Sequence, residues 1–227
     1  MTTLLHALAS GVIIIAMPVF LTTHCVRWVT LDERFYVDEF ARYNVSRVTG
    51  LNQDQLRDVA RAFISYFTGD DHALQITVAG QPLFNQREID HMRDVQALMQ
   101  RVFAAWLISI AAILLSTVAL LAPNPSPGAR SLARATAIGG VSAAVLVGMV
   151  AAGASLDFSQ LFLQFHFLSF SNDLWLLDPR RDRLIQLFPE GFFFDAALRI
   201  GVQTVLFGLG VAGASVAVLL FARRPAP

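Results

Sequence analysis

Four long apolar stretches alternate with polar segments along this chain of 227 residues. A helix that crosses the hydrocarbon core of a bilayer needs about 20 mostly apolar residues, because each residue adds roughly 1.5 Å of rise. Each stretch reaches that length, and none has an acidic residue near its centre. We therefore predict a mainly α membrane protein with four transmembrane helices, at 1–29, 102–122, 135–156 and 196–222.

The charged residues predict how these helices are oriented. All 17 acidic residues fall in two parts of the chain, 32–94 and 157–195. The link at 123–134 and the tail at 223–227 hold arginine and no acid, and short arginine-bearing loops stay in the cytoplasm. Both termini are therefore expected in the cytoplasm, and the two acidic segments on the outer side of the membrane.

The first outer segment, 30–101, is long enough for a small, mostly helical extracytoplasmic head. Apolar residues recur at helical spacing from Leu56 to Phe67, and Asn52 with Gln55 forms a capping box in front of them. These signals predict an amphipathic helix with one apolar face.

The end of this segment predicts a hairpin and a second capped helix. The turn Ala79-Gly80-Gln81 lies between two short apolar runs, which favours a hairpin. Asn85 and Glu88 form another capping box. No helix breaker follows before Leu121, so we expect this helix to continue directly into the second span.

The second outer segment, 157–195, is rich in phenylalanine, with nine of the chain's 18 phenylalanines between 158 and 194. Phe158, Leu161, Phe162 and Phe165 share one helical face, while polar residues occupy the other. This pattern is typical of a helix that lies in the membrane interface with its apolar side in the acyl chains. A turn is expected at Asp178-Pro179-Arg180.

Composition and charge limit the possible functions. Only 15% of the residues are charged, whereas a soluble domain of this length has roughly a quarter. The net charge of zero gives a nucleic-acid partner no electrostatic support. The single cysteine, Cys25, excludes an internal disulfide and a thiolate metal cluster.

Two glycine patterns fall inside predicted spans. Gly208, Gly210 and Gly213 match the spacing of the dinucleotide fingerprint, but no strand precedes them, so we assign no nucleotide site. Gly140 begins a run of small residues at every fourth position through Ala152, and Gly208 begins a similar pair. Small residues at this spacing let helices approach closely in lipid. We expect the third and fourth spans to pack through them.

His91 is the first candidate for chemistry. Glu88 and Asp94 lie three residues to either side of it, and Arg87 lies four residues before it, so all four share a helical face. A carboxylate beside an imidazole fixes its tautomer and raises its pKa, which suits a general acid or base. The alternative is the exposed polar face of a charged helix, which is the more common role of a single histidine.

His166 is the second candidate. It lies in the run Phe165-His166-Phe167 on the predicted interfacial helix. An apolar environment lowers the pKa of an imidazole and leaves a neutral base near neutral pH. The alternative is a histidine whose ring nitrogens point toward water. Two outward-facing histidines near one bilayer depth favour a shared site.

A metal site is not expected. The spacing of Glu88 and His91 also occurs in di-iron bundles, but those proteins need a second such motif and two further glutamates. This sequence has neither.

The chain carries a series of short motifs, spread over nearly its whole length, that together resemble the bacterial lipoprotein intramolecular transacylase (Lit) family. That family is part of a larger group of four-span membrane proteins of unassigned function. The most specific are the His-Met-x-Asp-Val motif at His91 and the Phe-His motif at His166. The stretch 169–172 departs from the more aromatic, proline-containing sequence expected there. The full set is Tyr43-Asn44-Val45, Thr49-Gly50-Leu51, Tyr66, Arg87-Glu88-x-x-His91-Met92-x-Asp94-Val95, Phe165-His166 and Leu187-Phe188-Pro189.

The resemblance implies a membrane-embedded acyltransferase of the bacterial cytoplasmic membrane. Such enzymes move the sn-2 acyl chain of a diacylglyceryl-cysteine lipoprotein to the α-amino group of that cysteine, which gives a lyso-form lipoprotein. The two essential histidines of the family match His91 and His166. The implied partners are the lipoprotein substrate and membrane lipid, and no cofactor is implied.

The implied reaction needs acid–base groups rather than a protein nucleophile, because ester and amine belong to one molecule. One histidine would act as base and the other as acid, at the outer leaflet. We expect Glu88, Asp94, Arg87 and Arg93 to orient these groups or to stabilise the oxyanion, with Arg180 or Arg181 as further candidates for the oxyanion. We expect the substrate to bind against four aromatic residues, Phe165, Phe167, Phe170 and Trp175.

Three other functions are alternatives for a four-span membrane protein of this kind. A non-catalytic membrane scaffold would tolerate replacement of both histidines. A lipid acyl hydrolase would release free fatty acid, because water would take the place of the amine. A transporter is disfavoured, because the predicted spans lack ionisable groups at mid-bilayer and paired broken helices.

Overall fold

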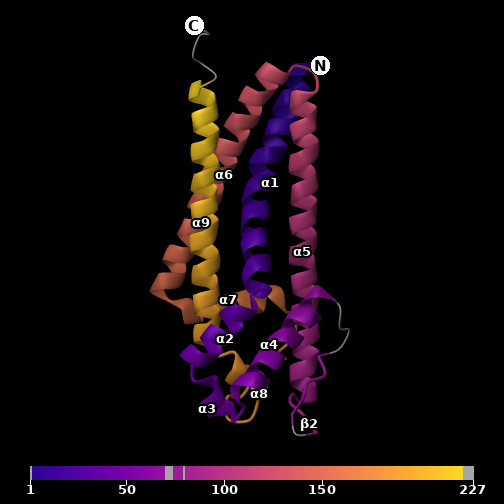
Figure 1. Ribbon diagram of the computed structural model, residues 1–227, viewed down its shortest axis with the longest axis vertical. Helices are drawn as coiled ribbons and strands as arrows, with labels where there is room; N and C mark the ends of the chain where they lie inside the picture. Colours follow the sequence, from indigo (N-terminus) through magenta and orange to yellow (C-terminus); the bar gives the residue numbers. More distant parts are fainter. Residues whose placement is uncertain (1, 70–73, 79, 222–227) are drawn as a thin grey trace. The chain divides into compact units, whose positions relative to one another are not determined.

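The computed structural model describes residues 2–69, 74–78 and 80–221, and these residues are mainly helical (Figure 1). Four helices are long and apolar enough to cross a membrane: α1, α5, α6 and α9. The predicted fold class is therefore confirmed. The elements are α1 (Thr2–Thr30), α2 (Glu33–Arg42), α3 (Val45–Thr49), α4 (Gln53–Thr68), β1 (Thr77–Val78), β2 (Gln81–Pro82), α5 (Gln86–Leu121), α6 (Pro125–Leu156), α7 (Phe158–Ser169), α8 (Arg183–Leu187) and α9 (Glu190–Phe221).

Three of the long helices begin earlier in the chain than the apolar stretches that predicted them. The sequence predicts a link at 123–134, yet α6 is helical from Pro125. Proline suits the first position of a helix, because the N–H that it lacks would have no partner there. Helix α5 runs without a break from Gln86 to Leu121, as expected. Helix α9 begins at Glu190, six residues before the predicted span.

The chain divides into two compact units. The first unit comprises the chain up to Val26, Phe103–Ala152 and the chain from Arg199. The second unit comprises Arg27–Val102 and Gly153–Leu198. Within the first unit, the beginnings of α1 and α6 and the ends of α5 and α9 lie at the same end (Figure 1). Successive helices of this unit therefore run in opposite directions.

The core of the first unit is built around α1. Ile13 of α1 and Leu120 of α5 have no exposed surface, and Ala135 and Ala143 of α6 are buried with them. Much of the rest of the four helices exposes large apolar side chains, such as Leu115 and Val150. An apolar exterior suits a protein whose surrounding solvent is lipid.

Helices α6 and α9 make their closest approach at two glycines. A Cβ atom built on Gly140 would lie 2.4 Å from the carbonyl oxygen of Gly208, and one on Gly208 would lie 2.5 Å from the carbonyl oxygen of Gly140. A hydrogen bond of 2.9 Å between the hydroxyls of Thr136 and Ser215 joins the same two helices. The predicted packing of the third and fourth spans is thus present at Gly140. It does not extend to Gly148, where a Cβ would meet no described atom within 4 Å.

The second unit has an aromatic core. Phe188 packs against Phe40 of α2 and Phe63 of α4, with ring centroids 5.5 and 4.7 Å apart. Phe192, in the first turn of α9, packs against Phe188 at 5.0 Å. Aromatic pairs at such distances add to the free energy gained by burying their area. These contacts join the two segments of the chain that form this unit.

The local signals of the second unit are largely confirmed. Asn52 and Gln55 form the reciprocal capping box that begins α4. Strands β1 and β2 pair as an antiparallel hairpin, and the Ala79 position of its predicted turn lies outside the described residues. The expected turn after Asp178 is present, since its carbonyl accepts the N–H groups of Arg181 and Asp182.

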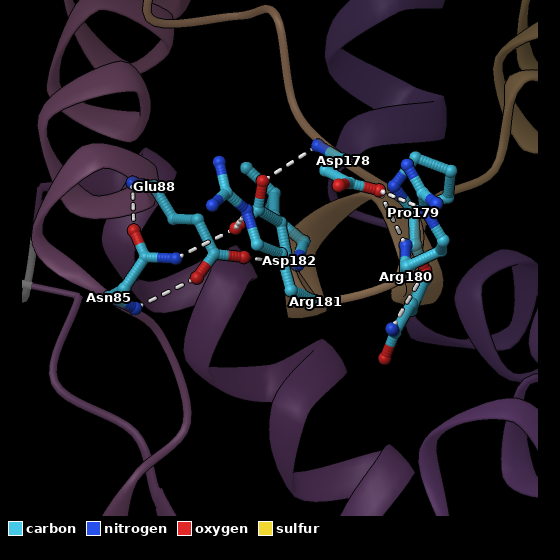
Figure 2. A network of polar contacts seen from close by, with 9 residues as sticks. Asn85, Glu88, Asp178, Pro179, Arg180, Arg181 and Asp182 are labelled. Atoms are coloured by element: carbon cyan, nitrogen blue, oxygen red, sulfur yellow. Dashed lines mark hydrogen bonds and ion pairs between the residues drawn. The ribbon is translucent and has the colours of Figure 1, made fainter.

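A buried polar network holds the first turn of α5 to the segment before α8 (Figure 2). The Glu88 side chain, only 1% exposed, accepts hydrogen bonds from the backbone N–H groups of Asn85 at 2.8 Å and Leu184 at 2.6 Å. The Asn85 amide donates to Asp182 at 2.9 Å, and Asp182 accepts the N–H of Asp178 at 2.7 Å. Because Glu88 bonds to Leu184 and Asn85 bonds to Asp182, the network fixes the start of α5 relative to the 178–184 segment.

Replacing Gly140 with alanine should destabilise the first unit. The new methyl group would overlap a backbone carbonyl that cannot rotate away, and such overpacking costs about 1–3 kcal/mol. We expect the thermal midpoint of the purified protein in detergent to fall by several degrees. Gly148→Ala, on the same helix with open space around it, is the control and should leave the midpoint unchanged or raise it. Equal midpoints for both variants would contradict this packing.

Replacing Glu88 with glutamine should also destabilise the protein. One carboxylate oxygen would become an amide group that points a donor at a backbone N–H, and a buried unsatisfied donor costs about 1–3 kcal/mol. Thermal unfolding measures the loss. The exposed Glu33, which pairs with Arg61 at 3.1 Å, offers the same chemical change as a control, and Glu33→Gln should cost under about 1 kcal/mol.

Candidate active site

His91 lies on the polar first part of α5. Residues 86–101 hold six charged side chains and belong to the second unit, whereas the apolar part of the helix follows them. The His91 side chain is buried, with 7% of its surface exposed. Its Nδ1 atom is buried and has no hydrogen-bond partner among the described residues. The alternative of an exposed charged face therefore does not describe His91.

His166 lies on α7, one turn from its end. Its Nδ1 atom is 2.7 Å from the carbonyl oxygen of Phe162. A carbonyl can only accept, so Nδ1 carries the proton in the neutral ring, and the lone pair is on Nε2. A histidine whose tautomer is fixed in this way presents a defined acceptor atom.

The second unit brings the two predicted histidines together. The ring centroids of His91 and His166 are 6.3 Å apart, and the ring planes are inclined by 29°. Phe170, which follows α7, contacts both rings, at 5.2 Å from His91 and 5.8 Å from His166. The rings therefore share one aromatic environment, although 75 residues separate them in the sequence.

Aromatic side chains surround His166. Phe162 and Phe165 meet its ring edge to face, at 4.5 and 5.5 Å. The Trp175 indole lies 4.9 Å from it and packs in turn on Phe167 at 5.2 Å. Three of the four predicted substrate-binding residues, Phe165, Phe170 and Trp175, thus contact the His166 ring, and the fourth, Phe167, contacts Trp175. Phe165 and Phe167 keep much of their surface exposed.

This environment keeps both imidazoles neutral. Burial lowers the pKa of His166, and the Phe162 carbonyl offsets part of that effect. Burial, and to a smaller extent the neighbouring His166 and Arg87, lower the pKa of His91 to about 4, although Asp94 acts in the opposite direction. The expected rise in pKa of an imidazole beside a carboxylate does not hold for His91, because desolvation outweighs the Asp94 carboxylate.

Two of the predicted supporting residues bind the loop that follows α7. The Asp94 carboxylate accepts a hydrogen bond of 2.8 Å from the side-chain amide of Asn172. The Arg87 guanidinium donates to the carbonyl of Asp173 and lies 3.5 Å from its carboxylate. The Arg87 Nε atom is buried and has no hydrogen-bond partner among the described residues.

The other two supporting residues, Glu88 and Arg93, bond to groups other than the two imidazoles. Both carboxylate oxygens of Glu88 accept hydrogen bonds from backbone N–H groups, so Glu88 holds α5 in place rather than orienting an imidazole. Arg93 pairs with Asp90, its neighbour on α5. Arg180 and Arg181, also considered for the oxyanion, pair with Asp178 and Asp182 in the network of Figure 2.

Asn172 and Asp173 are site residues that the sequence did not reveal. Both lie in an irregular loop, where no periodicity predicts a direction for a side chain. The stretch 169–172 differs from the expected family sequence, which was the one available signal. Among the described residues, no group of three histidine, cysteine, aspartate or glutamate side chains is arranged to hold a metal ion.

Comparisons with known proteins identify the fold and the family. Structures of the membrane-integral lipoprotein intramolecular transacylase Lit from Bacillus cereus match 96% of this chain and 95% of their own. One has a TM-score of 0.73 at 21% identity, and a variant with one histidine replaced by alanine has a TM-score of 0.79 at 19% identity. No curated protein matches the sequence. The model of the family described as lipoprotein intramolecular transacylase Lit matches residues 11–193. The chain therefore belongs to the lipoprotein intramolecular transacylase (Lit) family.

Proposed function

We propose that this protein moves the sn-2 acyl chain of a diacylglyceryl-cysteine lipoprotein to the α-amino group of the same cysteine. The observation that supports this most strongly is the pair of neutral imidazoles, 6.3 Å apart, in an aromatic environment. Donor ester and acceptor amine are in one molecule, and alignment of such groups can supply about 7–11 kcal/mol of the barrier. The protein then has to move protons and stabilise charge.

The proton transfers can be assigned to the two rings. In our proposal, the nitrogen of the substrate amine attacks the ester carbonyl, and Nε2 of His166 takes a proton from that amine. The ester C–O bond then breaks, and His91 gives its ring proton to the departing glycerol oxygen and regains one from His166. The amide and the free hydroxyl are the products, and both imidazoles return neutral. The fixed Nδ1–H of His166 supports its role as base.

Arg87 is our candidate for stabilising the oxyanion of the tetrahedral intermediate. Its guanidinium is held by Asp173, and its buried Nε–H has no acceptor among the described residues. A preoriented donor of this kind stabilises charge that develops during the reaction. Arg93 is a weaker candidate, because Asp90 already pairs with it.

We propose that α7 lies at the outer surface of the bacterial cytoplasmic membrane, with membrane lipid and the acyl chain of the substrate against its apolar side. Phe167 is 61% exposed and Leu168 87% exposed, and no residue of α7 is fully buried. An apolar surface of this kind is stable against acyl chains and costly against water. The arginines at 130 and 134 and the even number of spans support a cytoplasmic location for both termini.

Replacing either histidine should abolish the reaction. We expect His91→Ala and His166→Ala to lose at least about 100-fold in rate, because positioned acid–base groups contribute on the order of 10² to 10⁴. Mass spectrometry of a reporter lipopeptide detects the N-acyl product. His6→Ala, in the first unit, is the control and should retain activity. Full activity of either site variant would exclude this acid–base scheme, and free fatty acid in place of amide would indicate a hydrolase.

The pH dependence should follow the substrate amine rather than the histidines. The amine must be neutral and has a pKa of about 8, so kcat/KM should rise about tenfold per pH unit below 8. An imidazole with a lowered pKa stays neutral as the pH falls through 6.5 and adds no second slope there. We therefore expect a slope of one that persists as the pH falls through 6.5. A slope that steepens to two near pH 6.5 would show that a histidine with an ordinary pKa takes part.

A further inference from the structure

The loop between α7 and α8 is fastened to α5 on both sides of His91. Asp94, three residues after His91, accepts the Asn172 amide at 2.8 Å. Arg87, four residues before His91, binds Asp173, the next residue of the loop. Residues at these spacings share the His91 face of the helix. The loop therefore crosses the same face of α5 that presents the imidazole.

Asn172 makes three hydrogen bonds that organise this loop. Besides its bond to Asp94, its side-chain oxygen accepts the backbone N–H of Leu174 at 3.1 Å. Its backbone carbonyl accepts the indole N–H of Trp175 at 2.8 Å. The indole that it holds lies 4.9 Å from the His166 ring. One residue thus connects the carboxylate beside His91 with the aromatic ring beside His166.

The bond between Asn172 and Asp94 also has an electrostatic consequence. A carboxylate on the His91 face could rotate to bond the imidazole directly and would then favour the charged ring. The groups that face His91 are Arg87 and Asp94 from α5, His166 from α7 and Phe170 from the loop. Of these, only Asp94 is negatively charged. An amide donor that holds Asp94 therefore helps His91 to remain neutral.

We propose that Asn172 is a positioning residue for the histidine pair, which fixes Trp175 against His166 and holds the Asp94 carboxylate away from a direct bond to His91. This inference rests on the proposed transacylase function for its effect on activity. Its effect on the two rings is independent of that function. Asn172 ends the stretch 169–172, which departs from the sequence expected from the family resemblance.

A charge-swap series tests the proposal. Asn172→Asp places a second carboxylate against Asp94, so repulsion should open the loop and lower kcat/KM at least about tenfold. Adding Asp94→Asn restores one donor and one acceptor, with their positions reversed. We expect kcat/KM of the double variant to recover to within about threefold of that of the unchanged protein. Ser171→Ala, the neighbouring loop residue, should have little effect. A fully active Asn172→Asp variant, or a double variant as impaired as the single one, would overturn the proposal.

A spectroscopic measurement separates this inference from the proposed function. The ring protons of His166 experience the ring current of Trp175, and their NMR signals can be assigned by comparison with His166→Ala. Asn172→Asp should move these signals toward those of a free imidazole, and the double variant should move them back. Unchanged signals in Asn172→Asp would refute the positioning role, whether or not the protein transfers acyl chains. Shifted signals in a protein that forms no amide would support the positioning role and refute the transacylase function.

Discussion

Two imidazoles whose ring centroids lie 6.3 Å apart are destabilised when both carry a charge. Two like charges at this separation repel by about 2–3 kcal/mol at an effective dielectric constant of about 20, and by more in a drier environment. Burial among phenylalanine and tryptophan rings keeps the imidazoles of His91 and His166 neutral, so the pair can exist in the resting protein. The arrangement of the second unit serves this constraint, because both rings must be held close together and away from water.

Carboxylates near the pair are used to build the site rather than to charge it. Glu88 binds two backbone N–H groups, and Asp94 binds the amide of Asn172. The bonds to Leu184 and Asn172 join α5 to segments 96 and 78 residues later in the chain. The polar groups thus supply rigidity, while the aromatic groups determine the protonation state of the imidazoles.

The first unit satisfies a different requirement. Its helices expose large apolar side chains and pack through small ones, as in the approach of α6 to α9 at Gly140 and Gly208. Lipid provides little hydrophobic driving force between helices, so close backbone contact and hydrogen bonds such as that of Thr136 with Ser215 stabilise the packing. The first unit therefore packs as helices in lipid do, through small residues, whereas the second unit packs around a buried aromatic core.

The sequence by itself determined the features that depend on local composition and periodicity. These include the four spans, the capping boxes at Asn52 and Asn85, the continuous helix α5 and the small-residue contact of α6 with α9. Motif resemblance singled out His91 and His166, but the spacing around His91 suggested that Glu88 and Asp94 would act on its imidazole. Only the tertiary structure decided that these carboxylates bind the backbone N–H of Leu184 and the side-chain amide of Asn172, and that desolvation outweighs the effect of Asp94 on the pKa of His91. Such contacts depend on where an irregular loop folds back onto a helix, and no local propensity encodes that position.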